Sequence, residues 1–141
     1  MNSKDYAKAI LAGMEAALKP LSFRKRSNYF STSRSDVVLL VQLQSSVSTT
    51  ADRLRATINL GVFSPALARK LGRSVQKPTS ADCHWNLRLG HLMGQPGDKW
   101  WEARNAAEAA SVADEIVDAL MHYGVPALDE VASTAKLADL W

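Results

Sequence analysis

The sequence predicts an α+β fold with one antiparallel sheet that helices cover mainly on one face. The first observation is a pair of neighbouring stretches, residues 36–46 and 53–63, in which apolar and polar residues alternate with the period of two typical of half-buried strands. The second is the helical spacing of apolar residues near both ends of the chain, with hairpin-length connections between strands. We expect a single domain over residues 1–141, with three to four strands in the order α-β-β-β-α-β-α-α.

The N-terminal segment is predicted to form a helix that ends before Pro20. Apolar side chains recur at helical spacing between residues 3 and 18, and Pro20 lacks a backbone N–H group and restricts the residue before it. Residues 23–32 then combine aromatic side chains with the basic run at residues 24–26. We expect one edge strand there, because charges on an unpaired edge protect it from aggregation.

The two central stretches are predicted to share one apolar face and one polar face. In residues 53–63 the even-numbered residues are apolar, and the first four odd-numbered residues are polar. The odd-numbered residues of the first stretch continue the apolar face, whereas its even-numbered residues change from apolar to amide-bearing at Gln42. The polar face is therefore expected to be covered at one end and open at the other. Residues 47–52 are rich in Ser, Thr and Asp, which is typical of a hairpin loop.

A short helix and a further strand are predicted after this pair. Ser64 is a helix-capping residue followed by proline at the first helical position, and Gly72 is a suitable stop. Residues 73–82 are polar, which favours a surface loop. Alternation resumes in residues 83–93, and we expect a strand there. Its apolar side is predicted to carry Cys83, Trp85, Leu87 and Leu89.

The C-terminal third is predicted to be helical. Residues 94–98 favour a turn in which Asp98 caps a long helix that begins near Trp100. Gly124 and Pro126 are expected to end this helix, and a short amphipathic helix follows. Three apolar side chains near the end of the chain are expected to pack on the body of the domain: Leu137, Leu140 and Trp141.

Composition argues against several classes of protein. No segment approaches the roughly 20 apolar residues of a membrane span. The first residues lack the apolar core of a secretory signal, so we expect a cytoplasmic location. Cys83 is the only cysteine, which excludes an internal disulfide. The net charge of +3 permits an anionic partner without requiring one.

Several short segments together resemble one known family. They are LKPLSFRKRSNYF, VVLLVQLQSS, INLGVF, HWNLRLGHLM followed by GDKWW, and the closing LW. This combination resembles the bacterial family known as domain of unknown function 4304 over nearly the whole chain. Ser22 stands where this pattern leads us to expect glycine. The resemblance implies a compact single domain, and it carries over no functional residue because the family has no assigned activity.

The open part of the polar face is the main candidate for a binding site. If the strands pair as predicted, amide, hydroxyl, imidazole and guanidinium groups gather there without a carboxylate. Such groups can bind a peptide backbone, a base edge or an anion. The other interpretation is the solvated face of a one-sided sheet. The candidate residues are Gln42, Gln44, Arg55, Thr57, Asn59, His84, Asn86 and Arg88, with Trp100 as a wall if it leans over the sheet.

Three functions are compatible with this surface. The first is a small binding or regulatory module whose polar face holds a protein or a small polar partner. The second is a sequence-indifferent nucleic-acid binder that adds the basic residues 24–26, 69–70 and Arg73, although these also fit a solvated surface. The third is an enzyme with His84 as general base and Arg88 as anion stabiliser, for which no second catalytic group can be named.

No metal or cofactor site is predicted. Cys83, His84 and His91 are the only close group of soft ligands, but Cys83 and His84 are expected to point to opposite faces of their strand. The glycines around residues 94–97 match neither the phosphate-binding loop of nucleoside triphosphatases nor the dinucleotide-binding pattern.

Overall fold

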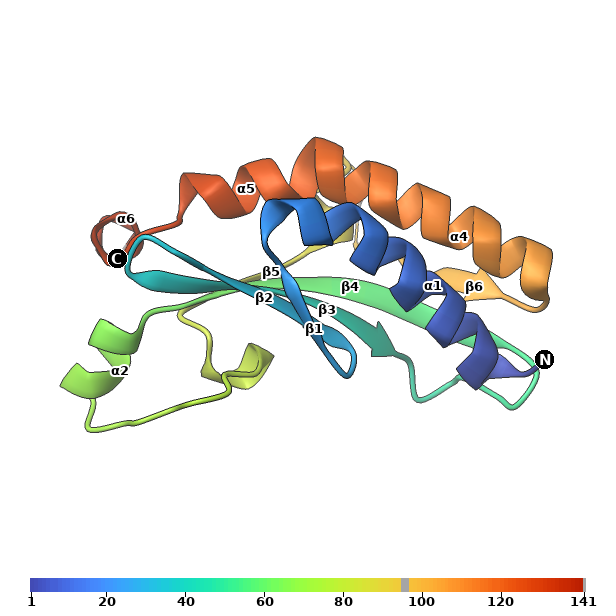
Figure 1. Ribbon diagram of the computed structural model, residues 1–141, viewed down its shortest axis with the longest axis horizontal. Coiled ribbons are helices and arrows are strands. Elements are labelled where there is room, and N and C mark those ends of the chain that lie inside the picture. Colours follow the sequence, from blue (N-terminus) through green and yellow to red (C-terminus); the bar gives the residue numbers. More distant parts are fainter. Residues whose placement is uncertain (95–96, 141) are drawn as a thin grey trace.

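The computed structural model describes residues 1–94 and 97–140. A curved antiparallel sheet carries two long helices side by side on one face, α1 (Ser3–Leu18) and α4 (Ala106–Ala119) (Figure 1). The α+β class and the antiparallel sheet are therefore confirmed. Within these residues the sheet has six strands: β1 (Arg24–Arg26), β2 (Tyr29–Arg34), β3 (Val37–Ser45), β4 (Leu54–Phe63), β5 (Trp85–Arg88) and β6 (Trp101–Ala103).

The strand count of three to four is wrong. Residues 23–32, predicted as one edge strand, form the hairpin of β1 and β2, which turns at Ser27 in a left-handed conformation with φ of 57°. The sixth strand, β6, comes from a segment that was predicted to be helical. The strands β1 and β6 have three residues each, which is too short to show an alternation in the sequence.

The strand β4 is the centre of the sheet. The strands follow the order β1-β2-β3-β4-β5, and β6 also pairs with β4. The pairing with β3 runs along nearly the whole of β4, whereas β5 pairs with residues 59–62 and β6 with residues 54–56. The second edge of β4 is therefore divided between two short strands, and residues 89–94 and 97–100 lie outside the sheet between them.

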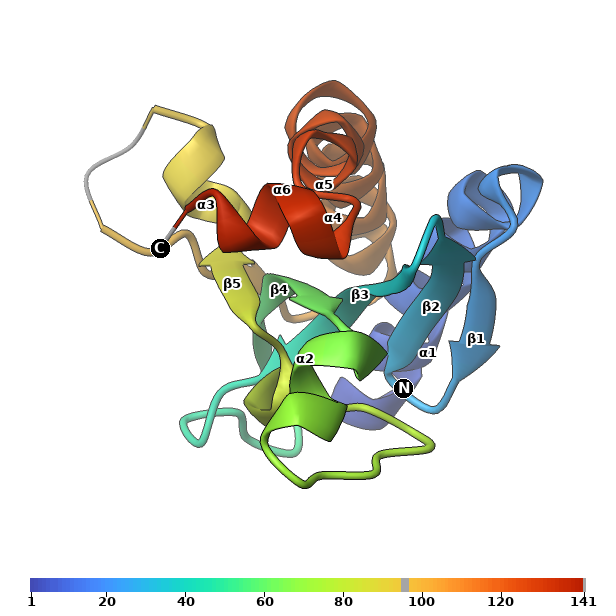
Figure 2. The same cartoon turned by 90° about the vertical axis from the view of Figure 1, so that its left-hand side faces the viewer.

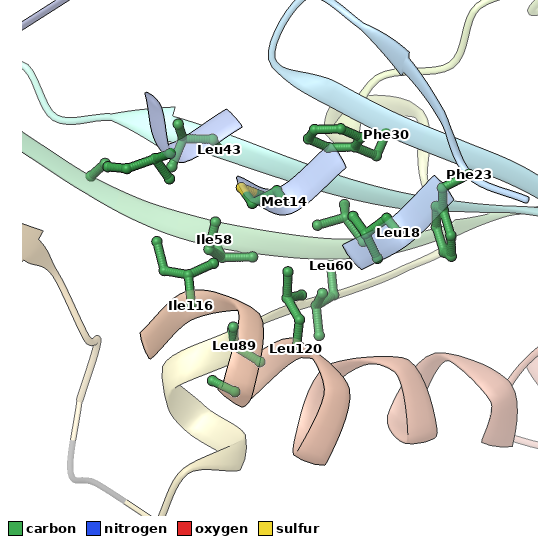
Figure 3. Packing of buried hydrophobic residues seen from close by; sticks show 14 of the residues in the cluster. Met14, Leu18, Phe23, Phe30, Leu43, Ile58, Leu60, Leu89, Ile116 and Leu120 are labelled. Carbon is green, nitrogen blue, oxygen red and sulfur yellow. The ribbon is translucent and has the colours of Figure 1, made fainter. Parts of the chain in front are cut away.

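The apolar face of β4 packs against both long helices, as the alternation predicts. Figure 3 shows Met14 and Leu18 of α1 and Ile116 of α4 directed toward Ile58 and Leu60 of β4, and all five side chains are fully buried. Helix α1 begins with a capping box in which Asn2 and Asp5 each accept a backbone N–H of the other.

Pro20 lies in a short 3₁₀ turn, η1 (Lys19–Leu21), directly after α1. Ser22 follows this turn with φ of 70°, in the left-handed region that favours glycine. The glycine expected at this position by resemblance thus has a structural reason, and serine accepts the same conformation here.

The predicted short helix is present as α2 (Pro65–Lys70), and the Ser64 hydroxyl caps it by accepting from the backbone N–H of Leu67 at 3.1 Å. It lies on the side of the sheet away from α4 and α5 (Val125–Glu130), with the following loop (Figure 2). Residues 73–82 are more than a surface loop, because they cross the polar face of the sheet. Their last part is a 3₁₀ turn, η2 (Ser80–Asp82), and Pro78 before it is buried.

The strand predicted for residues 83–93 is shorter than expected. Only β5 continues the sheet, and the chain then turns into α3 (Leu89–Leu92). At Gly90 an added Cβ would lie 2.5 Å from the Cβ of Lys99, so only glycine lets these two segments approach so closely. This contact closes the excursion that separates β5 from β6.

The long helix begins later than predicted. Asn105 caps α4, and Trp100 and Asp98 both precede it. Gly124 and Pro126 do not end the helical run, because α4 continues through a π-helical turn, η3 (Leu120–Gly124), into α5. The backbone of Gly124 packs close to Leu60 and Leu89, where an added Cβ would lie 3.6 and 3.3 Å from their side chains.

The C-terminal segment packs in part as predicted. Helix α6 (Thr134–Ala138) buries Leu137 completely, whereas Leu140 is 57% exposed. Trp141 lies outside the described residues. No helix among residues 1–94 and 97–140 has the length and apolar character needed to cross a membrane.

We predict that Gly61→Ala destabilises the protein by about 1–3 kcal/mol. A Cβ at this position would lie 2.7 Å from Sγ of Cys83, which packs against the bare backbone of β4. Urea denaturation of the two proteins measures the difference in the free energy of unfolding. Combining the change with Cys83→Ala removes the sulfur and should recover part of the loss. Equal stability of Gly61→Ala and wild type would contradict this packing.

Candidate functional site

A row of polar side chains crosses the sheet from edge to edge. The strand pairings place each of these residues beside the next on the face opposite α1 and α4, so the alternation predicted the polar face correctly. The row consists of Arg26, Tyr29, Gln42, Asn59 and Arg88.

Hydrogen bonds between amides hold the middle of this row. The amide nitrogen of Asn59 donates to the side-chain oxygens of Gln42 at 2.9 Å and of Gln44 at 2.6 Å. Three of the predicted residues are therefore joined into one cluster. Because the side-chain oxygen of Gln44 accepts from Asn59, the amide N–H groups of Gln44 are the donors that this bond does not use.

Ser80 completes this cluster, although the sequence did not single it out. Its hydroxyl donates to the side-chain oxygen of Gln42 at 2.9 Å, and its backbone N–H donates to the phenol oxygen of Tyr29 at 3.1 Å. Residues 76–82 are thus tied across the polar face. The capping pattern of Thr79 and Asp82 is the only local signal for this turn, and it does not indicate where the turn packs.

A cleft of about 510 Å³ opens beside the amide cluster. One side of the cleft is formed by residues 80–81, which belong to the crossing segment (residues 73–82). The other side is formed by the excursion between β5 and β6. Four of its lining residues were predicted as contacts, namely Gln44, Asn59, Asn86 and Arg88. The other lining residues are Leu60, Ser80, Ala81, Leu87, His91 and Asp98.

One carboxylate organises the outer wall of the cleft. Asp98 forms an ion pair with Arg88 and lies 2.8 Å from Nε2 of His91 through its other oxygen. The sequence predicted that Asp98 would cap a helix, and this prediction is wrong. The site therefore contains the carboxylate that the predicted residue set lacked, because the excursion brings Asp98 back over the end of β5.

Trp100 lies between two guanidinium groups. The Cζ atoms of Arg55 and Arg88 are 4.9 and 5.1 Å from the centre of its ring, which is the geometry of a cation–π contact. Trp100 is half-buried and Arg55 lies near Glu102, with 3.8 Å between Nε and Oε1. The structure thus places Trp100 beside the polar face, on the excursion and not on a helix.

Thr57 is placed below the site and not on its surface. Its side chain is fully buried, and its hydroxyl donates to the backbone oxygen of Lys99 at 2.7 Å. This bond holds the segment that carries Asp98 and Trp100 against β4. Thr57 therefore positions the wall of the cleft and is closed off from a partner.

His84 lies outside the cleft, at the far end of β4. Its Nδ1 accepts the backbone N–H of Ser64 at 3.0 Å, and its ring packs on Phe63 with 5.5 Å between the ring centres. Burial, and secondarily the positive charge of Arg73, lower the pKa of His84. The lone pair that a general base needs already accepts a backbone N–H. Arg88 lies four residues farther along the chain, at the other end of β5.

Cys83 lies on the polar side of the sheet, so its predicted place on the apolar side is wrong. Cys83 precedes β5, which begins at Trp85, so the alternation of that strand does not extend to it, and its sulfur packs on Gly61. Burial, with a smaller effect of the neighbouring Asp82, raises the pKa of the Cys83 thiol to about 12. Within the part of the chain that the structure describes, no three His, Cys, Asp or Glu side chains are arranged to hold a metal ion.

Comparison with known families agrees with the resemblance of the short motifs. Residues 14–130 match the family described as a domain of unknown function, DUF4304. The chain belongs to this family. The DUF4304 match runs from the last third of α1 to the end of α5 and includes every residue of the cleft. Comparisons with curated proteins and with solved structures gave no match.

We predict that His84 titrates below its ordinary pKa of about 6.5. Protonation of Nδ1 would break its bond to Ser64 and charge a group partly removed from water. Between the two pKa values the unfolded chain binds this proton and the folded chain does not, so the free energy of unfolding should fall as the pH drops below about 6.5. Two-dimensional NMR of the imidazole resonances against pH, with His84→Gln for assignment, measures the pKa. A value at or above 6.5 would refute the prediction.

We also predict that Cys83 reacts slowly with thiol reagents in the folded protein. A pKa of about 12 leaves very little thiolate at pH 8, so the reaction should be about a thousandfold slower than in the unfolded chain. Absorbance changes with a disulfide reagent, with and without urea, give the two rates. Similar rates in both conditions would show that the thiol is neither buried nor shifted.

Proposed function

We propose that this DUF4304 domain is a binding module that holds a polar segment of a partner protein in the cleft. The observation that carries the proposal is the position of Trp100 between Arg55 and Arg88, at the edge of an amide-lined cleft. Tryptophan and arginine are the residues most enriched at the energetic centres of protein interfaces. Here they adjoin a cleft large enough to receive side chains of a partner.

The arrangement is held in place before any partner arrives. Asp98 fixes Arg88, Glu102 lies near Arg55, and the bond from Thr57 to Lys99 holds the backbone next to Trp100. Side chains that are already ordered lose little conformational entropy on binding. This favours a specific contact surface over a solvated sheet face.

The chemistry of the cleft suits a peptide segment. Gln44 offers amide N–H groups to backbone carbonyls, and Asn86 is exposed and carries both a donor and an acceptor. Arg88 is shared between the cleft and the tryptophan, so one guanidinium connects a polar contact region with an aromatic one. With its lone cysteine in a reduced state, such a module would act in the cytoplasm.

We predict that Trp100→Ala and Arg88→Ala each weaken binding of the partner by about 2 kcal/mol or more, which is roughly 30-fold. Affinity capture from a lysate of the source cells, with and without nuclease, identifies the partner. Calorimetry with that purified partner then gives the affinities. Arg34→Ala is the matched control, because Arg34 also pairs with a surface carboxylate, Asp129 at 2.5 Å, at the other end of the sheet.

The outcomes separate the possible partners. Loss of one nuclease-resistant protein from both cleft variants, and its retention by Arg34→Ala, supports the proposal. If nuclease treatment removes the captured material, nucleic-acid binding replaces the proposed protein binding. If all variants capture the same proteins, the cleft and Trp100 are only solvated surface. Circular dichroism verifies that each variant is folded.

A further inference from the structure

A second groove lies on the same face of the sheet, beyond the crossing segment. It has a volume of about 340 Å³ and is formed by the hairpin of β1 and β2, the start of β3 and the loop after α2. Its lining residues are Arg24, Lys25, Arg26, Ser31, Ser33, Val38, Leu40, Gln76, Lys77 and Pro78. Four of them are cationic and none is acidic.

These four cations differ from six arginines elsewhere on the surface, which form ion pairs. The arginines at positions 34, 53, 55, 73, 88 and 104 all lie within 4 Å of a carboxylate. Among the described residues, no carboxylate forms an ion pair with any cation of the groove. The groove therefore concentrates positive charge that no carboxylate compensates, and such charge attracts an anion.

Two arginines are aligned along the groove by the sheet itself. Arg24 pairs with Ser31, and Arg26 pairs with Tyr29, so both side chains start from the polar face. Arg26 is fixed further, because its guanidinium donates to the backbone oxygen of Pro78 at 3.1 Å and lies 5.5 Å from the centre of the Tyr29 ring. Charges that only protected an edge strand would need no such anchoring.

The remaining lining adds hydroxyl groups and an apolar floor. Ser31 and Ser33 project from the same face of β2, beside Arg24. Beside them on the same face lie their strand partners in β3, Val38 and the buried Leu40. Guanidinium, ammonium and hydroxyl groups together are the donors that bind phosphate oxygens in proteins.

We propose that this groove binds a small ligand with two or more phosphate groups. Arg24, Arg26 and Lys77 supply positive charge for such a ligand, whereas Lys25 pairs with the buried Phe30 and starts from the opposite face of β1. The volume is at the lower end of the range found for small-molecule sites. The crossing segment ends the groove at Pro78, which favours a compact ligand over a continuous chain. The groove and the cleft share no lining residue. The test of phosphate binding is therefore independent of the protein-binding proposal.

The test is isothermal titration of the full chain with pyrophosphate and, separately, with a nucleoside triphosphate. We expect saturable binding of at least one of them, and weakening by about tenfold or more for Arg24→Ala and for Lys77→Ala, because each removes a charge-assisted contact. The double variant Arg69→Ala, Lys70→Ala is the matched control. It removes two charges from exposed positions of α2 outside the groove, and binding should stay within about twofold of wild type.

A third titration uses a single-stranded oligonucleotide to separate the two sources of phosphate. An affinity that exceeds that of both small ligands and rises with oligonucleotide length would overturn the proposal in favour of a nucleic-acid backbone. Absence of saturable binding to both small ligands would also overturn it. Equal weakening by the groove variants and the α2 control would show only nonspecific attraction of anions.

Discussion

The divided edge of β4 is the constraint on which the rest of this structure depends. A single long partner on that edge would have left a flat sheet with a solvated polar face. Instead, β5 and β6 share the edge, and residues 89–94 and 97–100 must lie outside the sheet between them. Gly90 permits the tight return beside Lys99, and Thr57 fixes it by a buried hydrogen bond. Asp98 and Trp100 reach the polar face only because of this excursion.

The long strands and the polar face were predictable because alternation over eight or more residues records which side is buried. The pairing of Gln42 with Asn59 and of Asn59 with Arg88 follows from that pattern once the strands are neighbours. The two short strands were not predictable in the same way. Three residues of β6 contain too little periodicity, and the alanine-rich sequence that follows them extends a helical pattern backwards over Trp101.

The composition of the site was less predictable than its place on the sheet. Gln44, Asn59, Asn86 and Arg88 line the cleft because they belong to regular strands. Asp98, His91 and Ser80 come from segments whose path depends on tertiary contacts and not on local preference. Thr57 was predicted to contact a partner, but it is buried. The alternation of the strand places Thr57 on the polar face, and it cannot reveal that a later segment of the chain covers this residue.

The crossing segment gives the two halves of the polar face different electrostatic characters. On the cleft side, Arg88 is neutralised by Asp98, so specificity there depends on shape and on individual hydrogen bonds. On the groove side, the cations lack such partners and long-range attraction dominates. Pro78 contacts Arg26 in the groove, and Ser80, two residues later, contacts Gln42 and lines the cleft. A ligand that displaced this segment from either side would also disturb the hydrogen bonds on the other, so the segment physically connects the two surfaces.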